Sequence, residues 1–332
     1  MGEFDLIARY FKRPARRAVL GVGDDCALLQ PRPGTQMAIS TDMLVSGRHF
    51  FANTDPHQLG HKSLAVNLSD LAACGAQPLA FTLALSLPGV DEPWLAAFAR
   101  GLLALADTHH CELIGGDTTA GPLNICITVF GEVPVLAGRS QALLRSGARA
   151  GDDLYVSGTL GDARLALDAL LGKVRLPDAV LASARQRLEQ PTPRVALGLA
   201  LRGVASAALD VSDGLLGDLG HILESSGVGA TVEADVTTSL IASRPLCIRA
   251  GGQFDIDFSE DDWRRLALSG GDDYELLFTA PAHQREAVQA ASRASRTPVT
   301  RIGQIDAAPG LRLIDSQGQP LANSYRSFDH FA

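Results

Sequence analysis

The sequence predicts an α/β protein of two domains. The chain has 332 residues, and this length favours two compact domains over one. Short apolar runs typical of strands alternate with longer segments whose apolar residues recur at helical spacing. Hydrophobic residues make up 46% of the chain and charged residues 20%, which is enough for a sizeable core. We place the domain boundary near residue 148, so that the expected domains are residues 1–148 and 149–332.

Charge and cysteine content exclude several classes of protein. The formal net charge of −8 argues against a general nucleic-acid binder, and an acidic protein that handles phosphates needs metal ions or local arginines. The five cysteines include no CxxC pair, so we expect neither a zinc site nor a disulfide framework, and we expect a reducing cytoplasm. We see no signal peptide and no apolar run long enough for a membrane span.

The first element expected is a short amphipathic helix over residues 3–12. Phe4, Ile7 and Phe11 recur there at helical spacing. A basic run follows within residues 9–17, and it is either a solvated face or an anion-binding surface.

Next comes a predicted hairpin that carries two acidic signatures. Residues 26–29 and 37–39 are apolar runs typical of strands, and a Pro-Arg-Pro-Gly turn separates them. Asp25 enters the first run and Asp42 follows the second. Because a hairpin brings its own ends together, we expect both carboxylates at the same edge of a sheet.

A divalent cation would explain this pair of carboxylates. Two neighbouring carboxylates repel each other unless a cation lies between them, and Mg2+ prefers oxygen ligands. Asp25 and Asp42 are therefore candidate metal ligands, with the Ser40 and Thr41 oxygens nearby. The alternative is that both aspartates merely cap strand ends.

Residues 57–75 predict a helix that is apolar on nearly every side. Ser63, Asn67 and Asp70 form a polar stripe along one face of it. A carboxylate on a buried helix is costly unless it is paired or bound to a metal, so Asp70 is a further candidate ligand. Alternatively, Asp70 accepts hydrogen bonds from the backbone or from Asn67.

The rest of the first half predicts a strand, a helix, and a glycine-rich phosphate site. Residues 79–87 are expected to form a strand, and Asp91 and Pro93 begin a helix that runs to about residue 110. A strand at residues 111–114 then leads into Gly115-Gly116-Asp117, where bare backbone can approach a phosphate closely. The alternative is a turn with a capping aspartate.

Residues 124–135 are expected to form another strand, and Gly131 is a possible bulge in it. Arg145 follows in a small, polar linker. It either clamps a phosphate or is an ordinary linker arginine.

The second half predicts a further alternation of strands and helices. Ser212 and Asp213 precede a helix, where free N–H groups favour anions, or where Asp213 simply caps the helix. Capping of this helix does not account for Asp210, which falls within the expected strand 207–211. Residues 269–274 are expected to form a loop. The expected strands are 154–157, 207–211, 231–233, 275–278, 299–304 and 311–314, and the expected helical segments are 162–172, 178–189, 193–203, 214–225, 263–268 and 283–294.

Some familiar nucleotide motifs are missing from the sequence. It contains no GxxxxGK[ST], no complete dinucleotide fingerprint and no GxSxG. Five aspartates instead lie at strand ends or on a buried helix, beside glycine, serine or threonine. Phosphoryl transfer that uses several Mg2+ ions fits such an oxygen-rich set. These aspartates are Asp25, Asp42, Asp70, Asp117 and Asp210.

The ordered motifs resemble one known family over nearly the whole chain. They are GDDCALL, ISTDMLV, NLSDLAACGA, LIGGDTT, RSGARAGD, DVSDGLLGDL and SGGDDYEL, with FDHF near the end. In this order they closely resemble the thiamine-monophosphate kinases, within the superfamily of aminoimidazole-ribotide synthetase and selenophosphate synthetase. The resemblance implies two α/β domains, of which the N-terminal one pairs its sheet across a homodimer and the C-terminal one completes the active site. It also implies ATP, thiamine monophosphate and Mg2+ as ligands.

The resemblance also implies roles for individual residues. The implied metal ligands are Asp25, Ser40, Thr41, Asp42, Asp70, Asp117, Asp210 and Asp213. The implied nucleotide contacts are Gly116, Asp117, Arg145 and Ser212, and the implied substrate contacts are His49, Asp272 and Phe328. Asp42, Asp117 and Arg145 are the implied catalytic residues. Related sequences often have Glu where Asp272 stands, which leaves its reach to the substrate open.

The implied reaction needs charge neutralisation more than it needs a base. The acceptor is already a phosphate anion, so we expect direct in-line transfer without a phosphoenzyme. One alternative is a sibling enzyme of the same superfamily. Selenophosphate synthetase would require a cysteine in an N-terminal glycine-rich loop, but no cysteine precedes Cys26. A hydrogenase-maturation relative would require a C-terminal cysteine, but the last cysteine is Cys247. Another alternative is a non-catalytic regulator that binds metal and nucleotide, against which the full carboxylate set argues.

Overall fold

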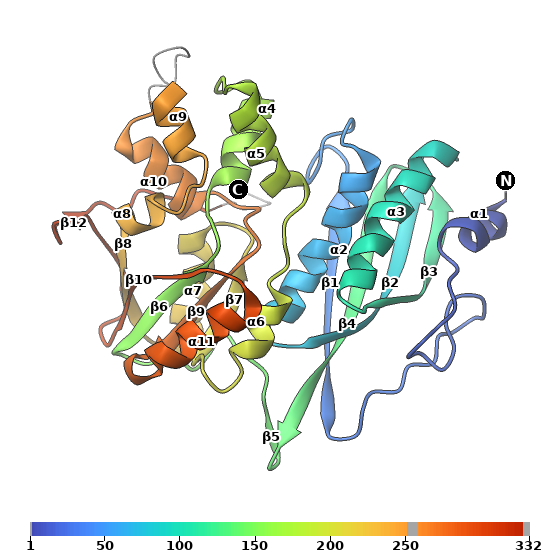
Figure 1. Cartoon of the computed structure of the whole chain (residues 1–332), viewed down its shortest axis with the longest axis horizontal. Coiled ribbons are helices and arrows are strands. Elements are labelled where there is room, and N and C mark those ends of the chain that lie inside the picture. The colour runs from blue at the N-terminus through green and yellow to red at the C-terminus, as the bar shows by residue number, and fades with distance from the viewer. Residues whose placement is uncertain (1, 251–257, 328–332) are drawn as a thin grey trace. The chain divides into compact units, whose positions relative to one another are not determined.

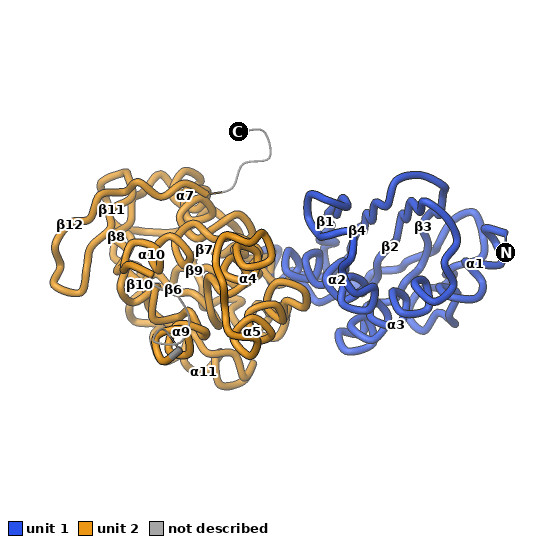
Figure 2. Tube along the Cα trace, turned by 90° about the horizontal axis from the view of Figure 1, so that it is seen from above, with its two compact units in different colours: residues 1–71, 75–142 blue, residues 72–74, 143–332 orange. Residues whose placement is uncertain are grey.

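The chain divides into two compact units. In the computed structural model, which describes residues 2–250 and 258–327, unit 1 comprises residues 1–71 and 75–142, and unit 2 comprises residues 72–74 and 143–332 (Figure 2). Within the described residues, no helix has both the length and the apolar character that a membrane span requires.

Unit 1 is built on a sheet whose strands follow the order β1-β4-β2-β3, with the short β5 paired to β4 (Figure 1). Strands β2 and β3 are parallel, and β4 is antiparallel to both β1 and β2. Helices α2 and α3 cover one face of this sheet. The elements are α1 (Glu3–Tyr10), β1 (Thr35–Val45), α2 (Pro56–Ala73), β2 (Gln77–Leu87), α3 (Glu92–Thr108), β3 (Glu112–Ala120), β4 (Asn124–Leu136) and β5 (Arg139–Ser140).

Helix α2 is buried along its length, as its apolar composition predicts. Leu59 and Leu71 are each 1% exposed. Two glycines let α2 and α3 approach closely: a Cβ on Gly60 would lie 2.1 Å from the Phe98 carbonyl oxygen, and one on Gly101 would lie 1.9 Å from the His57 carbonyl oxygen. The tight helix pair therefore fixes the position of the α2 polar stripe over the sheet.

Unit 2 is built on a seven-stranded sheet in the order β12-β11-β8-β10-β6-β9-β7. Its strands are β6 (Asp152–Ser157), β7 (Ala207–Val211), β8 (Gly229–Glu233), β9 (Glu275–Pro281), β10 (Val299–Asp306), β11 (Gly310–Ile314) and β12 (Pro320–Leu321). Its helices are α4 (Asp162–Leu170), α5 (Asp178–Glu189), α6 (Val195–Ala200), α7 (Leu215–Ser226), α8 (Ala234–Thr238), α9 (Arg244–Ala250), α10 (Glu260–Ser269), the 3-10 turn η1 (Ala282–Gln284) and α11 (Arg285–Ser295).

The main core of unit 2 joins its sheet to helices α4, α5, α7 and α10. Leu154 and Val156 of β6 belong to this cluster together with Leu219 of α7 and Leu266 of α10. Helix α11 contacts β9 and β10 as well as α6. Every residue of the inner strand β6 is buried, and so is every residue of β7, although β7 is the last strand in the sheet order.

Two local expectations are wrong. Residues 26–29 do not form a strand paired with 37–39; they make only the single bridge Leu20–Leu28, and β1 pairs instead with β4. Asp42 consequently lies inside β1 rather than beyond its end. The Gly115-Gly116-Asp117 segment is not a loop after a strand, because β3 continues through it beside β2. Parallel pairing with β2 supplies hydrogen bonds that a local pattern does not reveal.

Gly131 lies opposite an irregularity in the sheet. The pairing of β2 with β4 shifts between Pro78 and Ala80, where Gly131 is the partner of Pro78. A Cβ at Gly131 would lie 2.9 Å from a methyl group of Leu71, so a glycine is needed for α2 to pack there.

Candidate active site

Three predicted metal ligands of unit 1 meet between β1 and α2. Ser40 and Asp42 share one face of β1 because side chains alternate along a strand. The Ser40 hydroxyl donates a hydrogen bond to a carboxylate oxygen of Asp70, and the Asp42 backbone N–H donates to the Asn67 side-chain oxygen at 3.1 Å. The polar stripe of α2 therefore faces the acidic segment of β1.

Thr41 lies on the opposite face of the same strand. Its hydroxyl oxygen is 2.8 Å from that of Thr128 on the neighbouring β4, and both side chains are on the exposed side of the sheet. The structure thus separates the Thr41 hydroxyl from the Ser40 hydroxyl and from the side chains of Asp42 and Asp70.

Asp25 and Asp117 line a different part of unit 1. They border a cavity of about 570 Å3, to which Asp24, Gly115 and Gly116 also contribute. Asp24 accepts a hydrogen bond from the Asp25 backbone N–H at 2.8 Å, which holds this tight turn. Asp25 and Asp117 thus share a cavity wall beside the glycine pair.

These two acidic groups lie at opposite edges of the sheet. Across the sheet, Asp42 of β1 is opposite Ile127 of β4, Ile127 is opposite Leu83 of β2, and Leu83 is opposite Gly116 of β3. Three strand spacings, roughly 14 Å, therefore separate β1 from β3. Within residues 2–250 and 258–327, no group of three or more His, Cys, Asp or Glu side chains is arranged to hold a metal ion.

In unit 2, the predicted site begins where β7 ends. Asp210 is 9% exposed and lies on β7, and helix α7 begins four residues after Val211. The backbone N–H groups of Ser212, Asp213 and Gly214 donate to one oxygen of Asp218 at 3.0, 3.1 and 3.1 Å. Asp218, rather than Asp213, therefore satisfies the helix terminus, and the alternative that Asp213 merely caps the helix is wrong.

The buried position of Asp218 has an electrostatic consequence. Burial, followed by the negative charge of Asp213, raises the pKa of Asp218 to about 6, while the three backbone hydrogen bonds oppose this rise. Gly214, at φ 123°, is the N-cap residue, and a Cβ there would lie 2.9 Å from the Ser269 carbonyl. The sequence alone gave no sign that an acid one turn into the helix would take these donors.

The loop before β9 lies directly beside this segment. The Asp272 N–H donates to the Ser212 carbonyl at 2.8 Å, and the Tyr274 N–H donates to the Val211 carbonyl at 2.8 Å. Asp272 and Tyr274 have φ values of 65° and 49°, an uncommon backbone conformation for residues other than glycine. Two motifs some sixty residues apart in the chain, DVSDG and SGGDDYEL, thus form one surface of unit 2.

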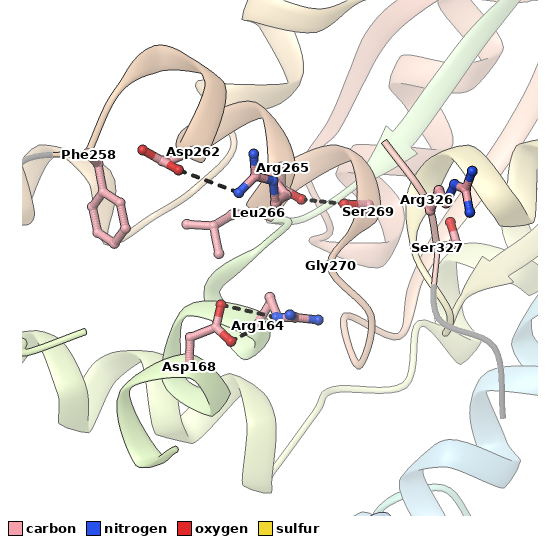
Figure 3. Close-up of a pocket in the computed structure, with 10 residues that line it drawn as sticks. All are labelled: Arg164, Asp168, Phe258, Asp262, Arg265, Leu266, Ser269, Gly270, Arg326 and Ser327. Carbon is pink, nitrogen blue, oxygen red and sulfur yellow. Dashed lines mark hydrogen bonds and ion pairs between the residues drawn. The ribbon is translucent and has the colours of Figure 1, made fainter. Parts of the chain in front are cut away.

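A cavity of about 430 Å3 opens next to this loop (Figure 3). Ser269 and Gly270 line it just ahead of Asp272, and Ser327 lines it from the C-terminal segment. The Gly217 N–H donates to the Ser327 hydroxyl oxygen at 2.9 Å, which ties that segment to α7. Phe328, the expected aromatic contact, is the next residue and lies outside the described residues.

The walls of the unit 2 cavity combine an aromatic ring with paired charges. Figure 3 shows Phe258 on one side and two ion pairs that involve Arg164 and Arg265. The Arg164 Nε donates to both oxygens of Asp168 at 3.1 Å, and Arg265 lies 3.7 Å from Asp262. Such a lining suits a small molecule that carries both rings and charge.

Two further predicted residues make local hydrogen bonds within their own units. The His49 Nδ1 accepts a hydrogen bond from the Val45 N–H at 3.0 Å, just beyond β1 in unit 1. Arg145 is exposed in unit 2, and its carbonyl accepts a hydrogen bond from the Ser226 hydroxyl at 3.4 Å.

An ionic cluster around the fully buried Glu275, behind the Asp272 loop, was missed by sequence reasoning. The Glu275 side chain is 0% exposed and binds Arg187 at 2.7 Å and Arg194 at 2.6 Å. Arg187 also donates to the Asp273 carbonyl at 2.9 Å. Burial raises the pKa of Asp273 well above its usual range. The only signal in the sequence was an acid at the head of an apolar strand.

Family comparisons agree with this arrangement. The model described as "AIR synthase related protein, N-terminal domain" matches residues 23–133, and the corresponding C-terminal domain matches residues 149–316. The chain is therefore an AIR-synthase-related protein of two matched domains.

Within that class, the chain belongs to the thiamine-monophosphate kinase family. It is 46% identical to the thiamine-monophosphate kinase of Salmonella typhimurium, covering 100% of this chain and 98% of that one. It is 33% identical to the enzyme of Bacillus subtilis over 92% of this chain and 91% of that one.

Solved structures give the same result. The crystal structure of thiamine-monophosphate kinase from Stenotrophomonas maltophilia has a TM-score of 0.81 and 48% identity, with 96% of each chain covered. AaThiL complexed with AMPPCP and TMP has a TM-score of 0.75 and 27% identity, covering 91% of this chain and 89% of that one. The two-domain α/β fold predicted from the sequence is thus confirmed.

Proposed function

We propose that the protein is a kinase that transfers the γ-phosphoryl group of ATP to thiamine monophosphate, giving ADP and thiamine diphosphate. The observation that carries this proposal is the 46% identity to a thiamine-monophosphate kinase across the whole chain. A relative whose structure holds AMPPCP together with TMP supports the pairing of an ATP analogue with this acceptor.

The chemistry calls for charge neutralisation and alignment. The acceptor oxygen belongs to a phosphate that is already anionic, so no strong general base is required. The barrier lies in bringing two anions together in line, which positive charge and fixed geometry overcome. We assign this charge in part to Arg145, and we assign nucleotide contacts to Gly116, Asp117, Arg145 and Ser212.

Mg2+ is the metal that fits the acidic residues. Ser40, Asp42 and Asp70 present only oxygen donors between β1 and α2, and hard cations prefer oxygen ligands. Bound Mg2+ would neutralise phosphate charge during transfer. The residues proposed to hold Mg2+ ions are Asp25, Ser40, Thr41, Asp42, Asp70, Asp117, Asp210 and Asp213, and of these Asp42 and Asp117 are also proposed as catalytic.

We assign the organic part of the acceptor to unit 2. The cavity beside Ser269 and Gly270 has an aromatic wall and both acidic and basic side chains, which suit a heterocyclic ring that carries charge. Its position next to the Asp272 loop supports Asp272 as a substrate contact, and the docking of Ser327 supports Phe328 as another. His49 is the substrate contact that we propose in unit 1.

A homodimer accounts for the exposed face of the unit 1 sheet. Strand β1 lies at the edge of that sheet, and its Ile39 and Met43 are 62% and 53% exposed on the side away from α2. An exposed apolar edge strand favours pairing with a second copy. All five cysteines are free thiols, which supports the reducing cytoplasm as the compartment.

A coupled ADP-release assay tests the function. ATP and Mg2+ are supplied with thiamine monophosphate, with thiamine, or with an aminoimidazole precursor, and only thiamine monophosphate is expected to support turnover. Turnover with the aminoimidazole precursor would instead indicate a sibling enzyme, and none at all would favour a regulator. Inversion at a chiral γ-phosphorus is expected for direct transfer, and retention would refute it.

A further inference from the structure

The segment between β7 and α7, residues 212–214, carries two residues of the proposed site. Ser212 is a proposed nucleotide contact and Asp213 is a proposed Mg2+ ligand, and both residues are half-buried. Backbone N–H groups at the start of a helix find no partner within the helix, so this segment needs an acceptor from elsewhere to keep its shape. The group that supplies the acceptor therefore sets where the two side chains lie.

The carboxylate of Asp218 supplies this acceptor from inside the unit. One of its oxygens accepts the N–H groups of all three residues, 212, 213 and 214, at 3.0, 3.1 and 3.1 Å. Asp218 is 5% exposed, and its helix neighbours Leu215 and Leu219 are 0% exposed, so a packed helix holds the carboxylate in place. Hydrogen bonds to an ionised acceptor are stronger than those between neutral groups, and three of them fix the backbone of the whole segment.

These hydrogen bonds also decide which groups of the segment a ligand can use. Free N–H groups at a helix N-terminus commonly bind phosphate, but here Asp218 takes them. A nucleotide or a metal ion is left with the Ser212 hydroxyl and the Asp213 carboxylate. Asp218 thus orients two ligand-binding side chains without offering its bonded oxygen to the ligand, as groups that support metal ligands do.

The other contacts of the segment do not duplicate this role. The Ser212 carbonyl accepts the Asp272 N–H at 2.8 Å, and the Gly214 carbonyl accepts the Ser327 hydroxyl at 3.4 Å. Both contacts use carbonyl groups of the segment, so neither can replace the acceptor that Asp218 supplies to its N–H groups. Loss of the Asp218 carboxylate would therefore leave three donors without their partner.

We propose that Asp218 is a positioning residue of the nucleotide and Mg2+ site, which holds residues 212–214 so that Ser212 and Asp213 can bind. This inference rests on the proposed kinase function and adds to it a residue that acts through others. Groups that orient metal ligands typically contribute about 10–100-fold to metal affinity or activity. Because Asp218 acts on Mg2+ through Asp213, its effect on Mg2+ affinity should largely vanish once the Asp213 carboxylate is removed.

The test measures the binding of Mg2+–ADP by titration calorimetry in variants of Asp218. Asp218→Ala is expected to weaken this binding by about tenfold or more, and to raise the Mg2+ concentration for half-maximal turnover similarly. Asp218→Asn keeps an acceptor oxygen on a side chain of the same length, so it is expected to restore most of the binding. In a chain that already carries Asp213→Ala, the further change Asp218→Ala is expected to alter Mg2+ affinity little.

Asp162→Ala is the matched control for a purely structural loss. Asp162 is 2% exposed, and its carboxylate accepts the N–H groups of Ala242 and Ser243 at 2.9 Å each, so it is another buried acid of unit 2 that is bonded to backbone. The control is expected to lower the melting temperature, as Asp218→Ala does, and to leave Mg2+–ADP binding unchanged. If both variants weaken that binding equally, or if Asp218→Ala leaves it intact, the positioning role is overturned.

A second substitution keeps the test decisive if Asp218→Ala does not fold. Asp218→Ser retains an acceptor oxygen, but on a shorter side chain that cannot reach all three N–H groups, so it is expected to fold and to weaken Mg2+–ADP binding. Binding as tight as that of the wild-type chain would overturn the inference. ADP binding is measured without thiamine monophosphate. If the wild-type chain makes no thiamine diphosphate, the kinase proposal fails, and the comparison of ADP binding still decides the role of Asp218.

Discussion

Replacing Glu275 by glutamine is expected to be the most destabilising conservative change near the Asp272 loop. The carboxylate is 0% exposed and binds two arginines that are themselves only 18% and 16% exposed. The Ser157 hydroxyl donates to it at 2.5 Å, and the Arg194 Nε donates to it at 2.7 Å. The substitution keeps the shape of the side chain but leaves the largely buried Arg187 and Arg194 without the counter-charge of Glu275.

The size of this effect follows from the burial of the ions. Breaking a buried ion pair by removing one partner costs about 3–5 kcal/mol, because the remaining charge stays desolvated. For a cooperative unit of roughly 150–250 residues, each 1 kcal/mol lowers the melting temperature by about 2–4 °C. Glu275→Gln should therefore lower the melting temperature of unit 2 by roughly 6–20 °C in scanning calorimetry at neutral pH.

A matched control separates burial from the mere loss of an ion pair. Glu260→Gln breaks the pair of Glu260 with Arg244, which has a similar N–O distance of 2.6 Å, but the Glu260 side chain is 61% exposed. Exposed pairs contribute about 0–1 kcal/mol, so this control should shift the melting temperature by only a few degrees. If the two variants melt together, the buried cluster does not contribute as reasoned here.

Three further predictions concern the site, the thiols and acid stability. Asp42→Asn should abolish turnover with an unchanged circular dichroism spectrum, and a near-normal rate would remove Asp42 from the metal set. Ellman's reagent should label the exposed Cys26 before the buried Cys111 and Cys247. Burial raises the pKa of both buried thiols, that of Cys247 to about 11, so few of them are present as reactive thiolates. Early labelling of either buried thiol would contradict this. Burial, together with neighbouring histidines, lowers the pKa of His109 to about 4, so its imidazole is neutral in the fold near neutral pH and protonation favours the unfolded chain. The contribution of neutral His109 to the free energy of unfolding should thus be fully present above pH 6.5 and should be lost as the pH drops toward 4. In urea titrations, His109→Gln should make the free energy of unfolding less dependent on pH over this range.

Long periodic elements could be predicted from the sequence. The helix expected at residues 57–75 is α2, and the strand expected at 207–211 is β7 with the same bounds. The polar stripe that singled out Asp70 does face β1, because helical spacing fixes which side chains share a face. The stripe became informative because α2 is otherwise apolar.

Features set by distant parts of the chain could not be predicted. Residues 26–29 were expected to form a strand that pairs with residues 37–39, but β1 pairs instead with the longer strand β4. The amides before α7 were expected to be open to phosphate, yet Asp218 takes all three, since a carboxylate one turn along can fold back onto them. The partners of Glu275 lie more than eighty residues away, so no local pattern marks them.

Transfer of the γ-phosphoryl group from ATP to thiamine monophosphate can be followed directly by 31P NMR. The protein is mixed with ATP, Mg2+ and thiamine monophosphate, and 31P NMR records every phosphate over time. We expect the thiamine monophosphate resonance to be replaced by the two resonances of thiamine diphosphate, in step with the conversion of ATP to ADP. Release of inorganic phosphate with thiamine monophosphate left intact would contradict it.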